Sequence, residues 1–308
     1  MHRGRFLRLA LCAALASGCA VQRAGLGVGP VEDNDLGLPP VDLGEGDSAA
    51  DPDLGGTELD LGTPELDSGS LCDPSLCAGR FCAGDDCGYA RSCNELKSAP
   101  GGPTTDGVYT LDGDGPDFLP AADAYCDMTN DVGGWTLVMK VDGGRTTFAY
   151  EAAYWTNDIE YPMSPLYDAV EAKLRTFRTV AFTQMRIVFV TRTETHAVVL
   201  DIGAISCVAL FNAGTFNTSV SRGTWLGLVP GSALQDNCNA EGINIAPGGS
   251  FDARTRIGIV ANEQPNCSSP NSRIGIGGGD PPAAGNIARW NGIGGDRNIS
   301  SFAYVFVR

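Results

Sequence analysis

Nine cysteines follow a leader-like N-terminus, and they restrict the chain to folds that disulfide bonds hold together. The first 18 residues, MHRGRFLRLALCAALASG, place three arginines before a short apolar run. That run is too short to span a bilayer as a permanent helix, and the pattern predicts an export signal. Of the 11 cysteines, Cys12 lies in this leader and Cys19 directly follows it. An oxidising compartment would pair most of the other nine, and their odd number leaves one free or joined to a second chain.

The end of the leader, LASGC at residues 15–19, resembles the cleavage site of a bacterial lipoprotein signal. Cleavage before Cys19 would leave its thiol to carry lipid. We therefore expect an exported lipoprotein of the outer membrane or cell surface, with ordinary secretion as the alternative. No later apolar segment approaches the length of a membrane span, so lipid would be the only anchor.

Residues 19–70 predict an extended acidic tether. Residues 24–70 contain 12 Asp and Glu and no Lys or Arg, and Asp-Leu-Gly recurs among prolines and serines. Such a segment buries too little apolar surface to offset its ordering entropy, although an irregular aspartate-glycine calcium repeat is an alternative. Removing these 12 acids from the total of 37 leaves 25 against 21 basic residues. The remainder is only mildly acidic and offers no basic surface for nucleic acid.

Residues 71–91 form a short cysteine-rich segment. Cys72, Cys77, Cys82 and Cys87 are each five residues apart, and Cys93 follows six residues later. A zinc site usually has a Cys-x2-Cys knuckle or a histidine, and this segment has neither. We therefore predict a small disulfide module with two bonds, whose pairing the sequence leaves open.

From residue 92 to residue 308 the pattern predicts an α+β domain with short twisted antiparallel sheets, few helices and long glycine-rich loops. Short apolar runs predict strands at 106–111, 133–141, 184–190, 196–202, 256–260 and 302–308. The third and fourth of these strands are expected to form a hairpin over 184–202. Residues 164–177 predict the main helix, with Ser164 as its cap and Pro165 in its first turn. The glycine cluster at 275–286 is expected to form loops rather than regular elements.

The start of this domain resembles a fibrinogen C-terminal-like domain. The resemblance rests on Ser-Cys at 92–93, Asp-Gly-Val-Tyr at 106–109, Tyr-Cys-Asp-Met at 125–128 and Gly-Gly-Trp-Thr-Leu-Val at 133–138. It implies a Cys93–Cys126 disulfide across the first hairpin. The glycine pair then allows a tight turn and Trp135 supplies a large buried anchor.

The C-terminal part is similar in plan to the intelectin branch of that superfamily, and to bacterial secreted proteins with the same signature. It carries Asn262 and Glu263 after a strand, then Cys267, a glycine-rich stretch, Trp290 and a closing aromatic strand that ends in arginine. Intelectins bind calcium and, through it, the exocyclic diols of sugars. The histidine pair and the later glutamate of that family are absent from this region of the chain.

The resemblance implies a Ca²⁺ site in the C-terminal loops, where oxygen ligands are plentiful. We take four residues as metal ligands and three as ligand-binding residues: Asn262, Glu263, Asp280 and Asp296 for the metal, and Asn271, Asn286 and Trp290 for the ligand. The alternative is that these Asn, Asp and Gly residues only form turns.

An enzyme is not expected. Apart from His2 in the leader, His196 is the only histidine, and it stands in an alternating pattern typical of a strand. No Gly-x-Ser-x-Gly or His-Glu-x-x-His motif occurs, and no two carboxylates stand out as a glycosidase pair. Trp155 and Trp225 are expected in the core.

Three late cysteines, Cys207, Cys238 and Cys267, predict one disulfide and one thiol that is free, joined to the N-terminal module or joined to a second chain. Together with the export signal, the resemblance implies a surface-anchored, calcium-dependent, lectin-like recognition protein for glycans or glycoconjugates. The alternatives are a protein-binding adhesion module without sugar specificity and a glycan hydrolase.

Overall fold

The computed structural model describes residues 80–83, 86–116, 118–161, 164–191, 194–249, 253–289 and 295–308, with the side chains of 81–86 left aside. The expected leader, the lipidation site Cys19, the tether, Cys72, Cys77 and Trp290 lie outside these residues, as does the side chain of Cys82. Within the described part, no helix has the length and apolar character needed to cross a bilayer.

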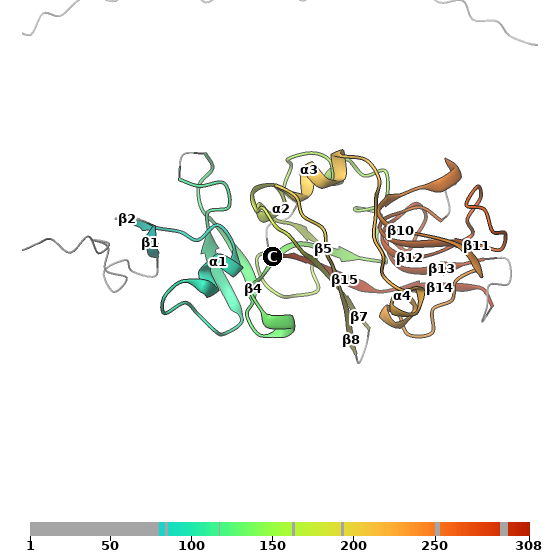
Figure 1. Cartoon of the computed structure of the whole chain (residues 1–308), viewed down its shortest axis with the longest axis horizontal. Coiled ribbons are helices and arrows are strands. Elements are labelled where there is room, and N and C mark those ends of the chain that lie inside the picture. Colours follow the sequence, from blue (N-terminus) through green and yellow to red (C-terminus); the bar gives the residue numbers. More distant parts are fainter. Residues whose placement is uncertain are drawn as a thin grey trace, which may run out of the picture. The chain divides into compact units, whose positions relative to one another are not determined.

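The described domain is rich in antiparallel strands and has four short α-helices (Figure 1). A two-stranded ribbon of β1 (Phe81–Ala83) and β2 (Asp86–Gly88) precedes two larger sheets. The helices are α1 (Cys93–Ser98), α2 (Thr176–Thr179), α3 (Cys207–Asn212) and α4 (Arg222–Leu228). Single 3₁₀ turns are η2 (Asn130–Val132), η3 (Ala153–Trp155) and η4 (Pro247–Gly249). The predicted class, sheet-rich α+β with few helices, is confirmed at this level.

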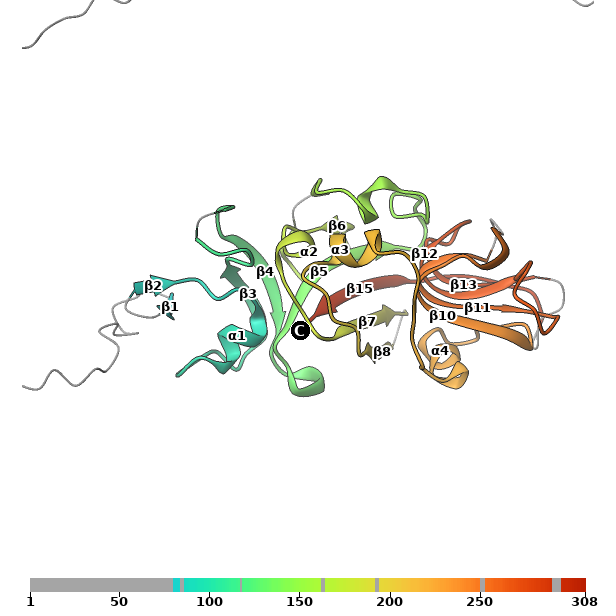
Figure 2. The same ribbon diagram turned by 45° about the horizontal axis from the view of Figure 1, so that its top comes forward.

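A seven-stranded sheet has the order β3-β4-β5-β15-β7-β8, with β6 paired to β5. Figure 2 shows the C-terminal strand β15 running between β5 and β7. The strands are β3 (Gly107–Leu111), β4 (Ala122–Asp127), β5 (Trp135–Asp142), β6 (Ala172–Lys173), β7 (Met185–Val190), β8 (Thr195–Leu200) and β15 (Phe302–Val307). The predicted strands in these regions and the β7–β8 hairpin are therefore confirmed.

A six-stranded sheet has the order β14-β13-β12-β11-β10-β9. Its strands are β9 (Phe216–Asn217), β10 (Asn237–Ile245), β11 (Thr255–Asn262), β12 (Ser272–Gly278), β13 (Ala284–Ala288) and β14 (Arg297–Ser300). Only β11 of these strands was predicted. One buried apolar cluster contains residues of both sheets together with Trp155 and Trp225, both fully buried as expected.

The expectation that residues 275–286 form loops is wrong, because both ends of this segment belong to buried strands. Gly242, Gly258, Gly275 and Gly285 lie opposite one another in register across β10 to β13. A Cβ on Gly258 would lie 2.2 Å from the Ile274 carbonyl oxygen, and one on Gly285 would lie 2.0 Å from that of Ile299. Glycine is therefore required here by close strand packing, not by a loop.

The predicted helix over 164–177 is also wrong. The segment forms bends, then β6, then the one-turn helix α2. Strand β4 pairs with β5 only at Trp135 and Thr136, which leaves the β5 edge open farther along at Met139 and Lys140. Strand β6 pairs with that open edge, and pairing of unsatisfied backbone groups overrides the local helix propensity.

Two disulfides close loops in the described domain. Cys93 at the start of α1 bonds Cys126 of β4, as the resemblance implied, and Cys238 of β10 bonds Cys267. Cys87 is also disulfide-bonded. Cys207 is the free thiol among the described cysteines, and it is fully buried. Burial raises the pKa of this thiol, and its position in the core keeps it from a second chain.

A buried ion pair connects β4 to β7. Nη1 of Arg186 donates to Asp127 Oδ2 at 2.7 Å, and both side chains are about 7% exposed. Burial by itself raises the pKa of Asp127, but hydrogen bonds from Asn130 and Arg186 outweigh it, and the net pKa is lowered. The Arg186 guanidinium also lies 5.9 Å from the centre of the Trp135 ring. The Tyr-Cys-Asp and Gly-Gly-Trp segments therefore meet at one ion pair.

We expect Asp127→Asn to lower the free energy of unfolding by about 2 kcal/mol at pH 7, because Arg186 loses its buried partner and keeps the more exposed Asp131 carboxylate, 2.7 Å from its Nε. The folded-state pKa of Asp127 lies below its ordinary 3.8, so its contribution is present above that pH and is lost as the pH falls through the lower value. Urea unfolding at pH 7 and pH 3 would show a smaller difference between variant and wild type at pH 3. Asp201→Asn is the matched control, because the exposed Asp201 side chain accepts one bond from Gln184. A difference that grows in acid would contradict the assignment.

The four glycines that face one another across β10 to β13, here called the glycine row, give a second testable prediction. Gly285→Ala should cost about 3 kcal/mol or more, since its φ of 133° is rarely adopted by residues with a side chain and the new methyl would strike the Ile299 carbonyl. Gly227→Ala in α4 is the control, because a Cβ there meets nothing within 4 Å and alanine favours the helix. Thermal unfolding of both variants measures the contrast. Equal stability of the two would contradict the packing argument.

Candidate functional site

The loop from residue 262 to residue 271 is fixed at both ends and in the middle. It connects β11 to β12, and the Cys238–Cys267 disulfide, with 5.1 Å between Cα atoms, joins it to β10. The Asn237 side-chain amide, also on β10, donates to the Glu263 carbonyl at 2.7 Å. The loop therefore presents its polar side chains from a defined position at one end of the six-stranded sheet.

Asn262 ends β11 and is fully buried. Its Nδ2 donates to Gln264 Oε1 and to the Asn266 carbonyl, each at 2.9 Å. Its Oδ1 is buried and has no hydrogen-bond partner. Leaving a buried acceptor without a hydrogen bond costs about 1–3 kcal/mol of folding free energy. Asn262 Oδ1 is therefore available to a cation or to a water molecule.

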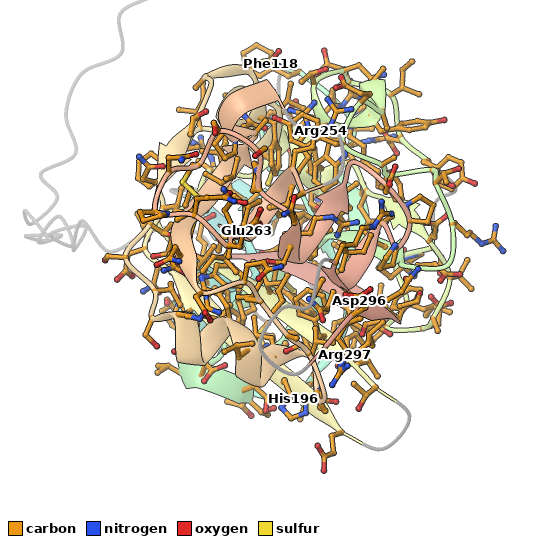
Figure 3. The ribbon with its side chains drawn as sticks, turned by 90° about the vertical axis from the view of Figure 1, so that its right-hand side faces the viewer. Phe118, His196, Arg254, Glu263, Asp296 and Arg297 are labelled. Atoms are coloured by element: carbon orange, nitrogen blue, oxygen red, sulfur yellow. A yellow bond between two sulfur atoms is a disulfide. The ribbon has the colours of Figure 1, made fainter. Side chains whose placement is uncertain are left out.

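Glu263, labelled in Figure 3, and Asn271 bring further polar groups to the same loop. The exposed Glu263 carboxylate accepts from Gln264 Nε2 at 2.7 Å and from Asn271 Nδ2. Asn271 itself is half-buried at the far end of the loop. We call this group the Glu263 cluster: Asn262, Glu263, Gln264, Asn266 and Asn271.

The side chains of Asp280 and Asn286 already have hydrogen-bond partners within the protein. Asp280 Oδ2 accepts from Arg289 Nη2 at 3.0 Å, and the Asp280 carbonyl accepts from the fully buried Arg273. Burial lowers the pKa of Arg273 to about 10, an effect that the nearby Asp280 opposes. Asn286 is also fully buried; its amide donates to the Ala233 and Arg273 carbonyls, and its Oδ1 accepts from the Ala233 N–H. Both residues hold the sheet and its turn together.

Asp296 is exposed, and Figure 3 shows it at a separate position from Glu263. Its carbonyl accepts from Arg297 Nη1 at 2.9 Å. Of the expected site residues that are described, the structure therefore brings together Asn262, Glu263 and Asn271. It does not bring Asp280, Asn286 or Asp296 into contact with them.

The composition of the Glu263 cluster suits a hard cation with few charged ligands. It offers one carboxylate, one buried amide oxygen without a partner, and backbone carbonyls, and these are the oxygen types that calcium takes. Within the described residues there is no group of three or more His, Cys, Asp or Glu side chains that could hold a metal. Any ion here would rely on amide and backbone oxygens as well as Glu263.

Sequence reasoning missed Asn237, Gln264 and Asn266. The signal that could have found them is the polar run Asn-Glu-Gln-Pro-Asn at 262–266, which ends at a half-cystine. His196, expected as a strand residue, lies half-buried on β8 with its Nε2 3.1 Å from Glu194 Oε2.

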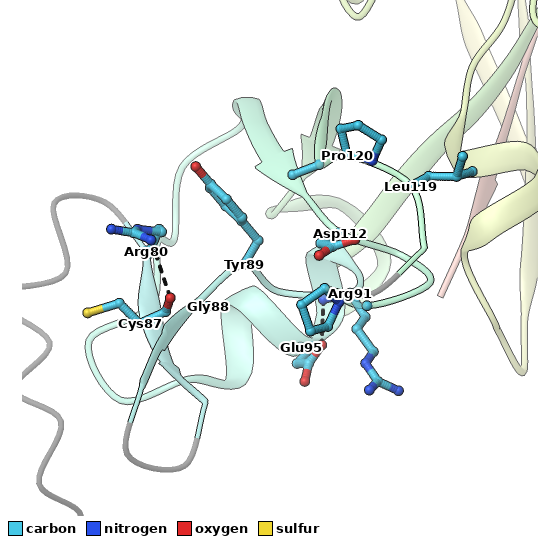
Figure 4. Close-up of a pocket in the computed structure, with 12 residues that line it drawn as sticks. Arg80, Cys87, Gly88, Tyr89, Arg91, Glu95, Asp112, Leu119 and Pro120 are labelled. Atoms are coloured by element: carbon cyan, nitrogen blue, oxygen red, sulfur yellow. Dashed lines mark hydrogen bonds between the residues drawn. The ribbon is translucent and has the colours of Figure 1, made fainter. Parts of the chain in front are cut away.

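A separate cavity of about 680 Å³ lies near the start of the domain (Figure 4). Tyr89, Glu95, Asp112 and Pro120 are among its lining residues. Asp112 is 8% exposed, and its Oδ1 has no hydrogen-bond partner. None of the residues expected from the sequence to bind metal or ligand lies in this cavity.

No protein-family model matches the chain, and no curated protein matches it.

The disulfide of the loop gives a testable expectation. Replacing Cys238 and Cys267 together by serine should lower the free energy of unfolding by about 3 kcal/mol, because a closed loop of this length restricts the unfolded chain. Amide hydrogen exchange should rise most over residues 262–271. Replacing the buried free Cys207 by serine is the control, and it should leave exchange in this loop unchanged. Unchanged protection of residues 262–271 in the double variant would contradict the assigned role of the disulfide.

Proposed function

We propose that this chain is an exported, calcium-dependent recognition protein for glycans, with a fibrinogen C-terminal-like domain of the intelectin type. Lipid on Cys19 and the acidic segment 19–70 would hold the domain at the cell surface. The proposal is one of binding without chemistry.

The single observation that carries the proposal is the buried Asn262 Oδ1, which has no partner and belongs to the residue before Glu263. The motif resemblance points to Asn262 and Glu263 as calcium ligands, and the orphan oxygen is an independent physical reason for a cation there. Asn271 supports it, because its amide already contacts Glu263 from the other end of the loop. Calcium in this place would order the loop and expose its outer coordination positions to sugar hydroxyls.

Asn262, Glu263 and Asn271 are the residues that would hold the ion. Asp280 takes no part in this proposal, because its carboxylate and carbonyl accept from the cationic Arg289 and Arg273. The donors to the Glu263 carboxylate are neutral amides. The loop disulfide and the Asn237 contact would limit the motion that an ion has to arrest, so less ordering entropy opposes binding.

Calorimetric titration of CaCl₂ into the chelator-stripped, oxidised full chain tests this proposal. We expect saturable binding by wild type and a loss of affinity of at least about tenfold in Glu263→Gln, which removes the one carboxylate. Asn262→Ala should also weaken binding. Glu194→Gln, an exposed carboxylate on the β7–β8 hairpin, is the matched control and should bind as wild type.

Glycan binding is tested in a second experiment. A glycan array probed in CaCl₂ and again in EDTA should give signals that the chelator removes and that Glu263→Gln lacks. No binding heat and no rise in Tm with calcium would refute the metal-dependent lectin. Capture of a protein partner that free sugars do not compete would then favour the adhesion module.

A further inference from the structure

Lys173 is a lysine in the core of the domain. It lies on β6 and is 1% exposed. Its backbone N–H donates to the Tyr161 carbonyl at 2.9 Å, and its carbonyl accepts from the Tyr161 N–H at 3.1 Å. Its Nζ lies 4.9 Å from the centre of the Phe177 ring. Pairing with Tyr161 on one side and Met139 on the other fixes the Lys173 backbone, and burial shields the amine from water.

Asn157 faces this amine from the turn that follows η3. Its N–H donates to the Ala153 carbonyl at 3.0 Å, which fixes the turn. Its Oδ1 accepts from Lys173 Nζ at 3.1 Å and from the Ile159 N–H at 3.2 Å. Lys173 Nζ also donates to the Asn157 main-chain carbonyl. The amine nitrogen therefore lies within hydrogen-bond distance of the side-chain amide whose carbon is Cγ, and the Ile159 N–H polarises the same carbonyl.

No carboxylate forms an ion pair with Lys173 among the described contacts, and this leaves a buried ammonium poorly compensated. Burial lowers the pKa of Lys173 to about 8, against the opposing charge of Asp158. A share of the amine is therefore uncharged near neutral pH, and the uncharged amine is the nucleophilic form. The fixed approach of the two groups replaces a bimolecular encounter, which gives such reactions a high effective molarity.

We propose that Lys173 and Asn157 join in an intramolecular isopeptide bond. Neutral Nζ attacks Asn157 Cγ, the Nζ–Cγ bond forms, and the Cγ–Nδ2 bond breaks. Nζ gives up one proton to the departing nitrogen, which leaves as ammonia, so no oxidant or reductant is needed. Asp158, exposed and adjacent in sequence, is a carboxylate that can relay this proton.

The bond would replace a buried charge by a neutral amide and would tie β6 to the turn after η3. Trp155, the fully buried last residue of η3, packs against the Phe211 ring at 4.8 Å. A covalent link would therefore fix the edge of the seven-stranded sheet to the aromatic core. Such a link suits a protein that bears force at a surface, and it does not depend on calcium or on sugar binding.

Peptide mass analysis of the purified, oxidised full chain, reduced before digestion, tests the proposal. Cleavage after glutamate at positions 151, 160, 171 and 194 separates residues 152–160 from residues 172–194. We expect these two peptides to appear as one species, joined through the side chains, whose mass is the sum of the two peptide masses less one ammonia.

Asn157→Ala and Lys173→Arg should each release the two peptides as separate species. Asn157→Asp should keep the link, now with loss of water in place of ammonia at the side chains. Lys140→Arg is the control, because Lys140 is fully buried but contacts the Asp168 carboxylate and the Leu166 carbonyl instead of an amide. It should leave the link intact.

Separate, unmodified peptides from the folded wild type would overturn the proposal and would leave Lys173 as a hydrogen-bonded core lysine. A link that persists in Lys173→Arg would overturn it as well. Both outcomes are read from the wild-type and variant masses alone, so they are independent of the calcium and glycan experiments.

Discussion

The pairing of β15 with both β5 and β7 is the interaction on which the rest of the described domain depends. This last strand lies in the middle of the seven-stranded sheet, although 112 positions separate its Phe302 from the paired Val190. It also follows β14 of the six-stranded sheet after Ser301 alone, so it links the two sheets directly. The buried cluster that both sheets share includes Ala303, Val305 and Val307 of this strand. The domain is therefore closed late in the chain, by long-range contacts.

The buried charged side chains of this domain contact polar groups that lie near them in the folded structure. Arg186 is paired with Asp127, and Arg273 donates to backbone carbonyls in the β12–β13 turn. Lys140 pairs with the Asp168 carboxylate, while Lys173 donates to the oxygens of Asn157 and forms no ion pair among the described contacts. A buried charge without a carboxylate is costly, and it therefore marks a place where the structure calls for a further explanation. Asn262 Oδ1 is the corresponding case for an acceptor.

The Cys238–Cys267 disulfide joins the loop of the candidate site to strand β10 of the six-stranded sheet. Two strands, β11 and β12, carry the loop, and the glycine row lets those strands approach closely below it. Gly275 and Gly285, which the sequence predicted to lie in loops, instead belong to paired strands. The polar side chains that do meet come from the loop between the strands, and the Asn237 amide on β10 donates to the Glu263 carbonyl of that loop.

The sequence by itself determined the strands with alternating or continuous apolar runs, the buried tryptophans and the sheet-rich class, because these follow from local hydrophobic pattern. The pairing of Cys93 with Cys126 came from a motif resemblance, and the structure agrees with it. Only the tertiary structure decided that 164–177 is not a helix, since the open β5 edge recruits Ala172 and Lys173. It alone showed that glycine-rich 275–286 enters two strands, because the need for glycine arises from neighbouring carbonyls. The tertiary structure also separated Asn262, Glu263 and Asn271 from two other expected site residues. Asp280 is bound by Arg289 and Arg273, and Asn286 by Ala233. This distinction depends on three-dimensional contacts, which residue type alone does not reveal.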